Sequence, residues 1–179
     1  ASFFGNATQG GGEIWSMAGI NFGSNLSDIL EKDDFTLEEL LVEDDLLQEI
    51  KSTNPTLLGY LSSAAAVNAM VNYVTIPAQS DSGDLVYFKY PYMSCEVFCC
   101  EVPSILHVLV EDNDGQYFTQ LLSALDSVKP LNHYLAGYFE KILDMLFRQM
   151  TIPVMSYLNK KGLCIFEKFL QHVDNYSIM

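Results

Sequence analysis

Short blocks of apolar residues at helical spacing constrain the fold of this 179-residue chain most strongly. Within each block, apolar side chains recur three or four positions apart, which places them on one face of a helix. Turn signals such as Asn54-Pro55 and Lys129-Pro130 separate the blocks. We therefore expect helices near residues 25–32, 36–42, 45–52, 55–61, 63–75, 91–100, 103–111, 116–126, 131–149, 152–160 and 162–173. Only Tyr87 to Tyr90 has strand propensity, and no second strand is evident to pair with it.

These helices predict an all-α protein. Helices of this length, stacked in pairs, build armadillo- and HEAT-like solenoids, in which each unit buries its apolar face against the next unit. No strict repeat is legible in the sequence itself. We expect residues 1–24, rich in Gly, Asn and Ser, to form a flexible lead, and residues 25–179 to form the helical-repeat domain. Since the sequence ends on an apolar stretch with no capping helix, we expect a truncated solenoid.

The charge balance narrows the classes of partner. The formal net charge is −14, and only nine Lys and Arg residues are scattered along the chain. Nucleic-acid grooves and anionic membrane surfaces require clustered positive charge, so neither is an expected partner. No apolar run is long enough to span a bilayer, and the N-terminus lacks the basic and apolar regions of a signal peptide. We expect a cytoplasmic protein with a basic protein partner.

The stretch from Phe35 to Lys51 carries six carboxylates and one lysine around a row of apolar residues. Thr36 and Glu39 have the spacing of a capping box at a helix start. Asp44 and Asp45 stand where a second helix begins, where acidic groups complement the helix dipole. Glu38 is expected to point outward. Caps and a solvated face explain most of these carboxylates. A partner-facing acidic patch and a metal or acid–base site remain as alternatives.

No motif for catalysis or for a cofactor is recognisable. The chain has no G-x-S-x-G elbow, no P-loop and no EF-hand pattern. Its three histidines are isolated, so each is expected at the core edge or on the surface. Cys95, Cys99, Cys100 and Cys164 are predicted to be reduced, buried, structural thiols, because no second ligand pair stands at zinc-finger spacing; a metal site is the less favoured alternative. We expect no catalytic residues, no metal site and no cofactor.

Several segments, read in order, resemble one family. They are IWSMAGI at 14–20, TLEELLVEDDLLQEIK at 36–51, FKYPYMSCEVFCCEVPSIL at 88–106, LAGYFEKILDMLF at 135–147 and FLQHVDNYSIM at 169–179. Together they resemble the opening of the SAPS domain, found in regulatory subunits of Sit-type, protein-phosphatase-6-like enzymes. The Met-Ala-Gly form of the first segment is most similar to plant members. The family's domain continues beyond the matched region.

The resemblance implies an armadillo- or HEAT-like scaffold without catalytic activity of its own. Such a scaffold would hold a protein phosphatase 6-type Ser/Thr catalytic subunit and, in some lineages, an ankyrin-repeat subunit, and it would direct substrate choice. From the resemblance we expect a cytoplasmic location and, in addition, a nuclear one. Ser16, Cys99 and Gln149 depart from the family pattern. They leave open an alternative function, a helical-repeat adaptor that has lost phosphatase binding.

Candidate interface residues follow from three kinds of signal. Large apolar residues in a flexible lead, exposed acids and close matches to the family each nominate a group. The candidates are Trp15 and Met17; Glu38, Glu43, Asp44, Asp45 and Glu49; and Tyr90, Pro91, Glu96 and Tyr138. The Ala136-Gly137 pair is interpreted as a close contact between helices.

Overall fold

The computed structural model describes residues 25–32, 34–79, 83–126 and 131–178, and within these ranges every regular element is helical. The predicted all-α class is therefore confirmed. The α-helices are α2 (Asn25–Leu30), α3 (Leu37–Leu41), α4 (Leu46–Lys51), α5 (Pro55–Leu61), α6 (Ala64–Thr75), α7 (Tyr90–Phe98), α8 (Pro103–Val110), α9 (Gln116–Leu122), α10 (His133–Gln149), α11 (Thr151–Lys161) and α12 (Cys164–Gln171). A π-helical turn, η1 (Leu85–Lys89), leads into α7, and two 3₁₀ turns, η2 (Asp112–Gly115) and η3 (Ser123–Asp126), flank α9.

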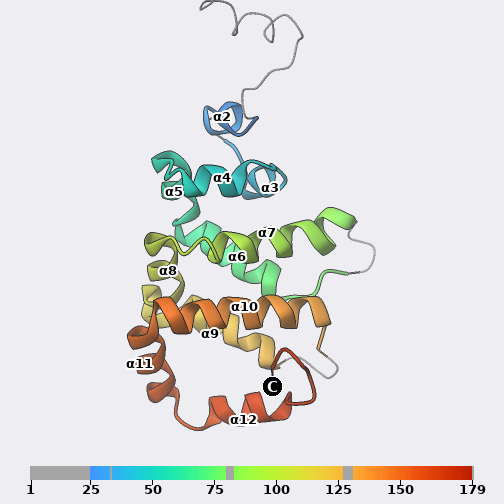
Figure 1. The fold of residues 1–179 in the computed structure, drawn as a ribbon, viewed down its shortest axis with the longest axis vertical. Helices are drawn as coiled ribbons and strands as arrows, with labels where there is room; N and C mark the ends of the chain where they lie inside the picture. Colours follow the sequence, from blue (N-terminus) through green and yellow to red (C-terminus); the bar gives the residue numbers. More distant parts are fainter. Residues whose placement is uncertain (1–24, 33, 80–82, 127–130, 179) are drawn as a thin grey trace, which may run out of the picture.

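The helices after α3 form three successive units of three helices (Figure 1). The first helices of the units, α4, α7 and α10, lie roughly parallel, one below another along the long axis. The second helices, α5, α8 and α11, gather on one side of the stack. The third helices are α6, α9 and α12, with α9 packed on α6 and α12 packed on η3. Helices α2 and α3 lie at one end of the stack, and α12 lies at the other.

Several side-chain contacts between successive units span 45 to 48 residues. Lys89 Nζ lies 3.2 Å from Asp44 Oδ1, 45 residues away. Gln120 Nε2 donates to Asn72 Oδ1 at 2.6 Å over 48 residues. His172 Nε2 lies 2.9 Å from the carbonyl oxygen of Leu125 over 47 residues. Armadillo and HEAT repeats have periods of roughly 40–47 residues, so these contacts support the predicted helical-repeat architecture. The repeat that is not legible in the sequence is present in the contacts.

Each unit buries the apolar faces that the sequence pattern predicts. In α10, for example, Ala136, Phe139, Ile142, Leu143 and Leu146 are buried. Their spacing of three and four residues forms a single stripe along the helix. The buried apolar side chains of all units join in one continuous core.

Local capping chemistry fixes several helix starts. Thr36 and Glu39 form the predicted capping box, in which the Glu39 amide donates to Thr36 Oγ1 at 3.3 Å and the Thr36 amide donates to Glu39 Oε2 at 2.9 Å. Asn54 caps α5 and Asn132 caps α10 through their side-chain oxygens. Asp45 occupies the N-cap position of α4, but its side chain makes no capping hydrogen bond. The capping box of Thr36 and Glu39 is therefore confirmed, and Asp45 lies at the start of α4 as predicted, without a capping hydrogen bond.

The cysteine prediction is correct for only part of the set. Cys95 is buried, Cys99 and Cys100 are half-buried, and Cys164 is exposed at the start of α12. The Cys164 thiol makes a local hydrogen bond instead, donating to the Lys161 carbonyl oxygen at 3.0 Å.

No single helix in the described ranges is long and apolar enough to cross a membrane. The segments Leu85–Phe98 and Pro103–Val110 pass that test only when they are taken together, and they meet at an angle of 104°.

Candidate partner-binding face

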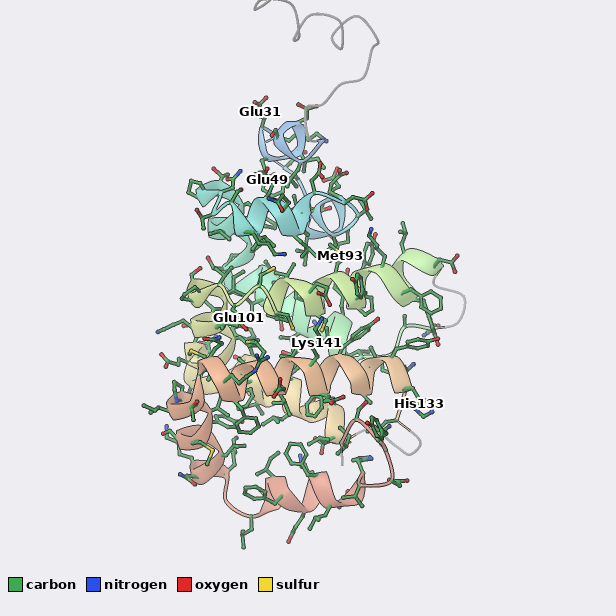
Figure 2. The ribbon with its side chains drawn as sticks, viewed as in Figure 1. Glu31, Glu49, Met93, Glu101, His133 and Lys141 are labelled. Atoms are coloured by element: carbon green, nitrogen blue, oxygen red, sulfur yellow. The ribbon has the colours of Figure 1, made fainter. Side chains whose placement is uncertain are left out.

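Contacts between the segments that begin the three units bring four of the nine described candidates together, namely Asp44, Asp45, Glu96 and Tyr138. We call this surface the ladder face, because pairs of side chains join the α3–α4 connection to η1 and α7 to α10 like rungs. It is defined by Asp44, Asp45, Phe88, Lys89, Tyr92, Glu96, Tyr134, Tyr138 and Lys141. Lys141 projects from α10 toward α7 in Figure 2.

The acidic end of the ladder face is formed by the connection between α3 and α4. Asp44 is paired with Lys89 at the end of η1, but its side chain is still 95% exposed. Asp45 is also exposed, and Glu43 is half-buried. These two aspartates therefore present negative charge to solvent, as a partner-facing acidic patch requires.

Two of the nominated glutamates are engaged inside the protein. The Tyr73 hydroxyl donates to Glu38 Oε1 at 2.5 Å, so Glu38 does not point outward as predicted. Burial and then this hydrogen bond to Glu38 raise the pKa of Tyr73 well above its ordinary value. Glu49 accepts from Asn54 Nδ2 at 3.4 Å and is half-buried. Sequence spacing alone could not reveal these partners, which leave both glutamates half-buried; their place in an interface stays a prediction.

The next nominated pair, Tyr90 and Pro91, also has a structural role. The Tyr90 ring packs against the Tyr73 ring with centroids 5.3 Å apart. Pro91 is buried in the first turn of α7, directly after η1. Tyr90 is half-buried and contacts α6 through Tyr73, whereas Pro91 is buried and offers little surface to a partner.

Glu96 and Lys141 form the central rung between α7 and α10. Their side chains are in direct contact as an ion pair. The hydrogen bond to Glu96 raises the pKa of Lys141, which keeps the ammonium charged. Both groups remain partly open to solvent, so the rung offers a paired positive and negative charge at the surface.

A cluster of aromatic rings completes the ladder face. Tyr138 packs near Tyr92 with centroids 6.5 Å apart, and Phe88 meets Tyr134 edge-on at 5.8 Å. Phe88, Tyr92 and Tyr134 are exposed, whereas Tyr138 is half-buried. Sequence reasoning nominated only Tyr138. The missed signal is the four-residue spacing of Phe88, Tyr92 and Glu96, which aligns them on one side of α7.

The ladder face thus combines exposed carboxylates, an ion pair and rigid aromatic rings. Tyrosine side chains are frequent energetic centres of protein interfaces, and flanking charges speed association. In the described ranges, no three His, Cys, Asp or Glu side chains are grouped in a way that could hold a metal ion. Trp15 and Met17 lie outside the described residues.

Comparison with known proteins identifies related sequences. The chain is 36% identical over 160 residues to serine/threonine-protein phosphatase 6 regulatory subunit 2 of Mus musculus, which covers 89% of this chain and 17% of that protein. It is 30% identical over 160 residues to regulatory subunit 3-B of Xenopus laevis, with 89% and 18% covered. Extragenic suppressor of kinetochore protein 1 of Schizosaccharomyces pombe is 30% identical over 171 residues, with 90% and 20% covered.

The chain therefore spans about a fifth of the length of the curated relatives that it matches, or slightly less. No protein-family model matches the chain. No solved structure matches it either.

Proposed function

Because this chain is a homologue of the protein phosphatase 6 regulatory subunits, the SAPS family, we propose that it is a non-catalytic regulatory subunit that binds a Ser/Thr phosphatase catalytic subunit. The observation that carries this proposal is the identity of 30–36% to named regulatory subunits, maintained over about nine-tenths of the chain. A scaffold of this kind acts by raising the effective concentration of the enzyme at its substrate.

The ladder face is our proposed docking surface for the catalytic subunit. Its aromatic rings provide contact area at low cost in side-chain entropy, because each ring has few rotatable bonds. Asp44 and Asp45 would attract a basic surface of the partner and accelerate association. An ankyrin-repeat subunit, the second partner that the resemblance implies, would bind elsewhere on the stack.

Capture of a protein phosphatase 6-type catalytic subunit by the tagged chain tests the proposal. We expect capture at low salt and weaker capture at high salt, since screening shortens the range of charge attraction. The double variant Asp44→Lys with Asp45→Lys should reduce capture about tenfold or more. The double variant Tyr92→Ala with Tyr134→Ala should reduce capture at both salt concentrations.

A matched control reverses two adjacent carboxylates away from the ladder face. Glu111 follows α8 and Asp112 begins η2. The double variant Glu111→Lys with Asp112→Lys changes the net charge by the same amount and should leave capture largely intact. Equal losses in both charge-reversed proteins would attribute the effect to net charge and reject the ladder face as the site. No capture by the folded parent chain would reject phosphatase binding and favour the adaptor alternative.

A further inference from the structure

A groove with a volume of about 360 Å³ lies between α10, α12 and the segment that follows α12. Figure 1 shows this segment turning back from α12 toward α10. We call the hollow the α10–α12 groove. None of the residues that define the ladder face lines it, so it is a separate surface of the stack.

Contacts on both sides hold the walls of the α10–α12 groove. At its base, the Phe139 ring of α10 lies 6.3 Å from the Phe169 ring of α12. The segment after α12 is fixed by a turn, in which the Ser177 amide donates to Asn175 Oδ1 at 3.0 Å. Ile178 then packs against the core. The groove is therefore part of the folded chain.

Aromatic side chains form the open part of the groove. Phe147 of α10 is 39% exposed, and Tyr176 of the segment after α12 is 87% exposed. The face of an aromatic ring carries partial negative charge and attracts cations, and its area also accepts apolar groups. The two rings therefore suit a side chain that is both apolar and positively charged.

Two carboxylates accompany these rings. Glu140 and Asp144 line the groove one turn apart on α10, and Phe147 follows three residues later on the same side. Asp144 is paired with Arg148 at 3.1 Å, but both side chains are mostly exposed, so this ion pair contributes little and can exchange partners. Glu140 is exposed and forms no ion pair with any described residue. Its charge is therefore available to a partner.

We propose that the α10–α12 groove binds an arginine side chain from a basic segment of a partner protein. Arginine combines an apolar stem with a planar cation that stacks on aromatic rings and pairs with carboxylates. The stem would pack between Phe147 and Tyr176, and the guanidinium would pair with Glu140. The net charge of −14 favours a basic partner over an acidic one. The proposal does not depend on phosphatase binding at the ladder face.

Fluorescence anisotropy with two labelled peptides tests the proposal. The first peptide carries Leu-Arg-Leu at the centre of a Gly-Ser sequence. In the second, citrulline replaces the arginine, which keeps the stem and removes the charge. We expect this chain to bind the arginine peptide about fivefold more tightly than the citrulline peptide. Glu140→Gln should remove most of this difference, because the carboxylate pairs with the charge that only the first peptide carries.

Further variants separate the aromatic and the charged contributions. Tyr176→Ala should weaken binding of the arginine peptide about threefold, since the cation loses its ring. Arg148→Gln should tighten it about twofold, because Asp144 is freed and a like charge is removed. Glu31→Gln is the matched control, since Glu31 is exposed at the opposite end of the stack in Figure 2, and it should change neither affinity. All four side chains are exposed, so the melting temperature should stay the same.

Four outcomes would overturn the proposal. Equal affinities for the two peptides would show that the groove accepts apolar groups without recognising charge. Equal losses in Glu140→Gln and Glu31→Gln would attribute binding to the net charge. No binding of the arginine peptide at millimolar concentration would reject the groove as a site for basic segments. A dimer in sedimentation that Tyr176→Ala converts to a monomer would assign the groove to a second copy of this chain.

Discussion

The surroundings of a single side chain in this stack can depend on a helix that is distant in sequence. The position of Glu38 on α3 predicts an outward side chain. In the structure, its carboxylate instead accepts a hydrogen bond from the Tyr73 hydroxyl on α6. Gly137 is the converse case. Its neighbour Ala136 suggests a tight helix contact, but a Cβ at Gly137 would meet no atom within 4 Å. The interpretation of a close contact at Gly137 is therefore wrong.

Replacing Gly137 with alanine should stabilise the protein by about 0.8–1 kcal/mol, since glycine in a helix interior loses more backbone entropy than alanine. Urea unfolding followed by circular dichroism would measure this change. The contrasting variant is Gly115→Ala. Gly115 has φ +75°, and a Cβ there would lie 2.9 Å from ring carbons of Tyr157. We expect Gly115→Ala to destabilise the protein by about 1–3 kcal/mol. A loss of stability in Gly137→Ala would contradict the open environment described for it.

At the scale of elements, helix starts are fixed by side chains within three residues of the cap. Thr36 and Glu39 satisfy each other's backbone amides, whereas Asp45 at the start of α4 makes no such bond. These two caps look alike in sequence, because both are oxygen-bearing residues before an apolar run. Their difference arises from backbone geometry, since Thr36 is extended and Asp45 is in the right-handed helical region.

Thr36→Ala should therefore lower the free energy of unfolding by about 1 kcal/mol, a typical loss for an N-cap side chain. Asp45→Ala should change it by only a few tenths of a kcal/mol, since no capping bond is lost. Chemical denaturation of both variants at the same pH compares them directly. Equal losses in the two variants would show that the bond between Thr36 and Glu39 contributes no stability.

At the scale of the whole molecule, charge is distributed unevenly along the stack. Residues 25–51 contain ten Asp and Glu against two Lys. The described part of this segment forms α2, α3 and α4 at one end of the stack. Crowded like charges repel each other and oppose the compact state, and salt screens that repulsion.

Raising the salt concentration from about 10 mM to about 150 mM should therefore raise the melting temperature by about 2–4 °C, since the Debye length falls from roughly 30 Å to 8 Å. Scanning calorimetry at fixed pH would measure the shift. Neutralising two exposed acids, with Asp34→Asn and Asp45→Asn, should reduce this salt dependence. A melting temperature that falls with added salt would show that charge repulsion is not the main electrostatic effect on stability.

The helical class, most helix boundaries and the Thr36–Glu39 cap could be predicted from the amino-acid sequence, because each depends on residues within about four positions of one another. The family resemblance could also be predicted from the sequence, since it rests on the order of short segments. The comparison with known proteins confirms it. Which residues share a surface became known only from the folded chain. The rungs of the ladder face and the contact between Glu38 and Tyr73 depend on side chains 35 to 45 residues apart. Local periodicity carries no information on such distances, because it places a residue on a face of its own helix but does not specify which helix that face meets.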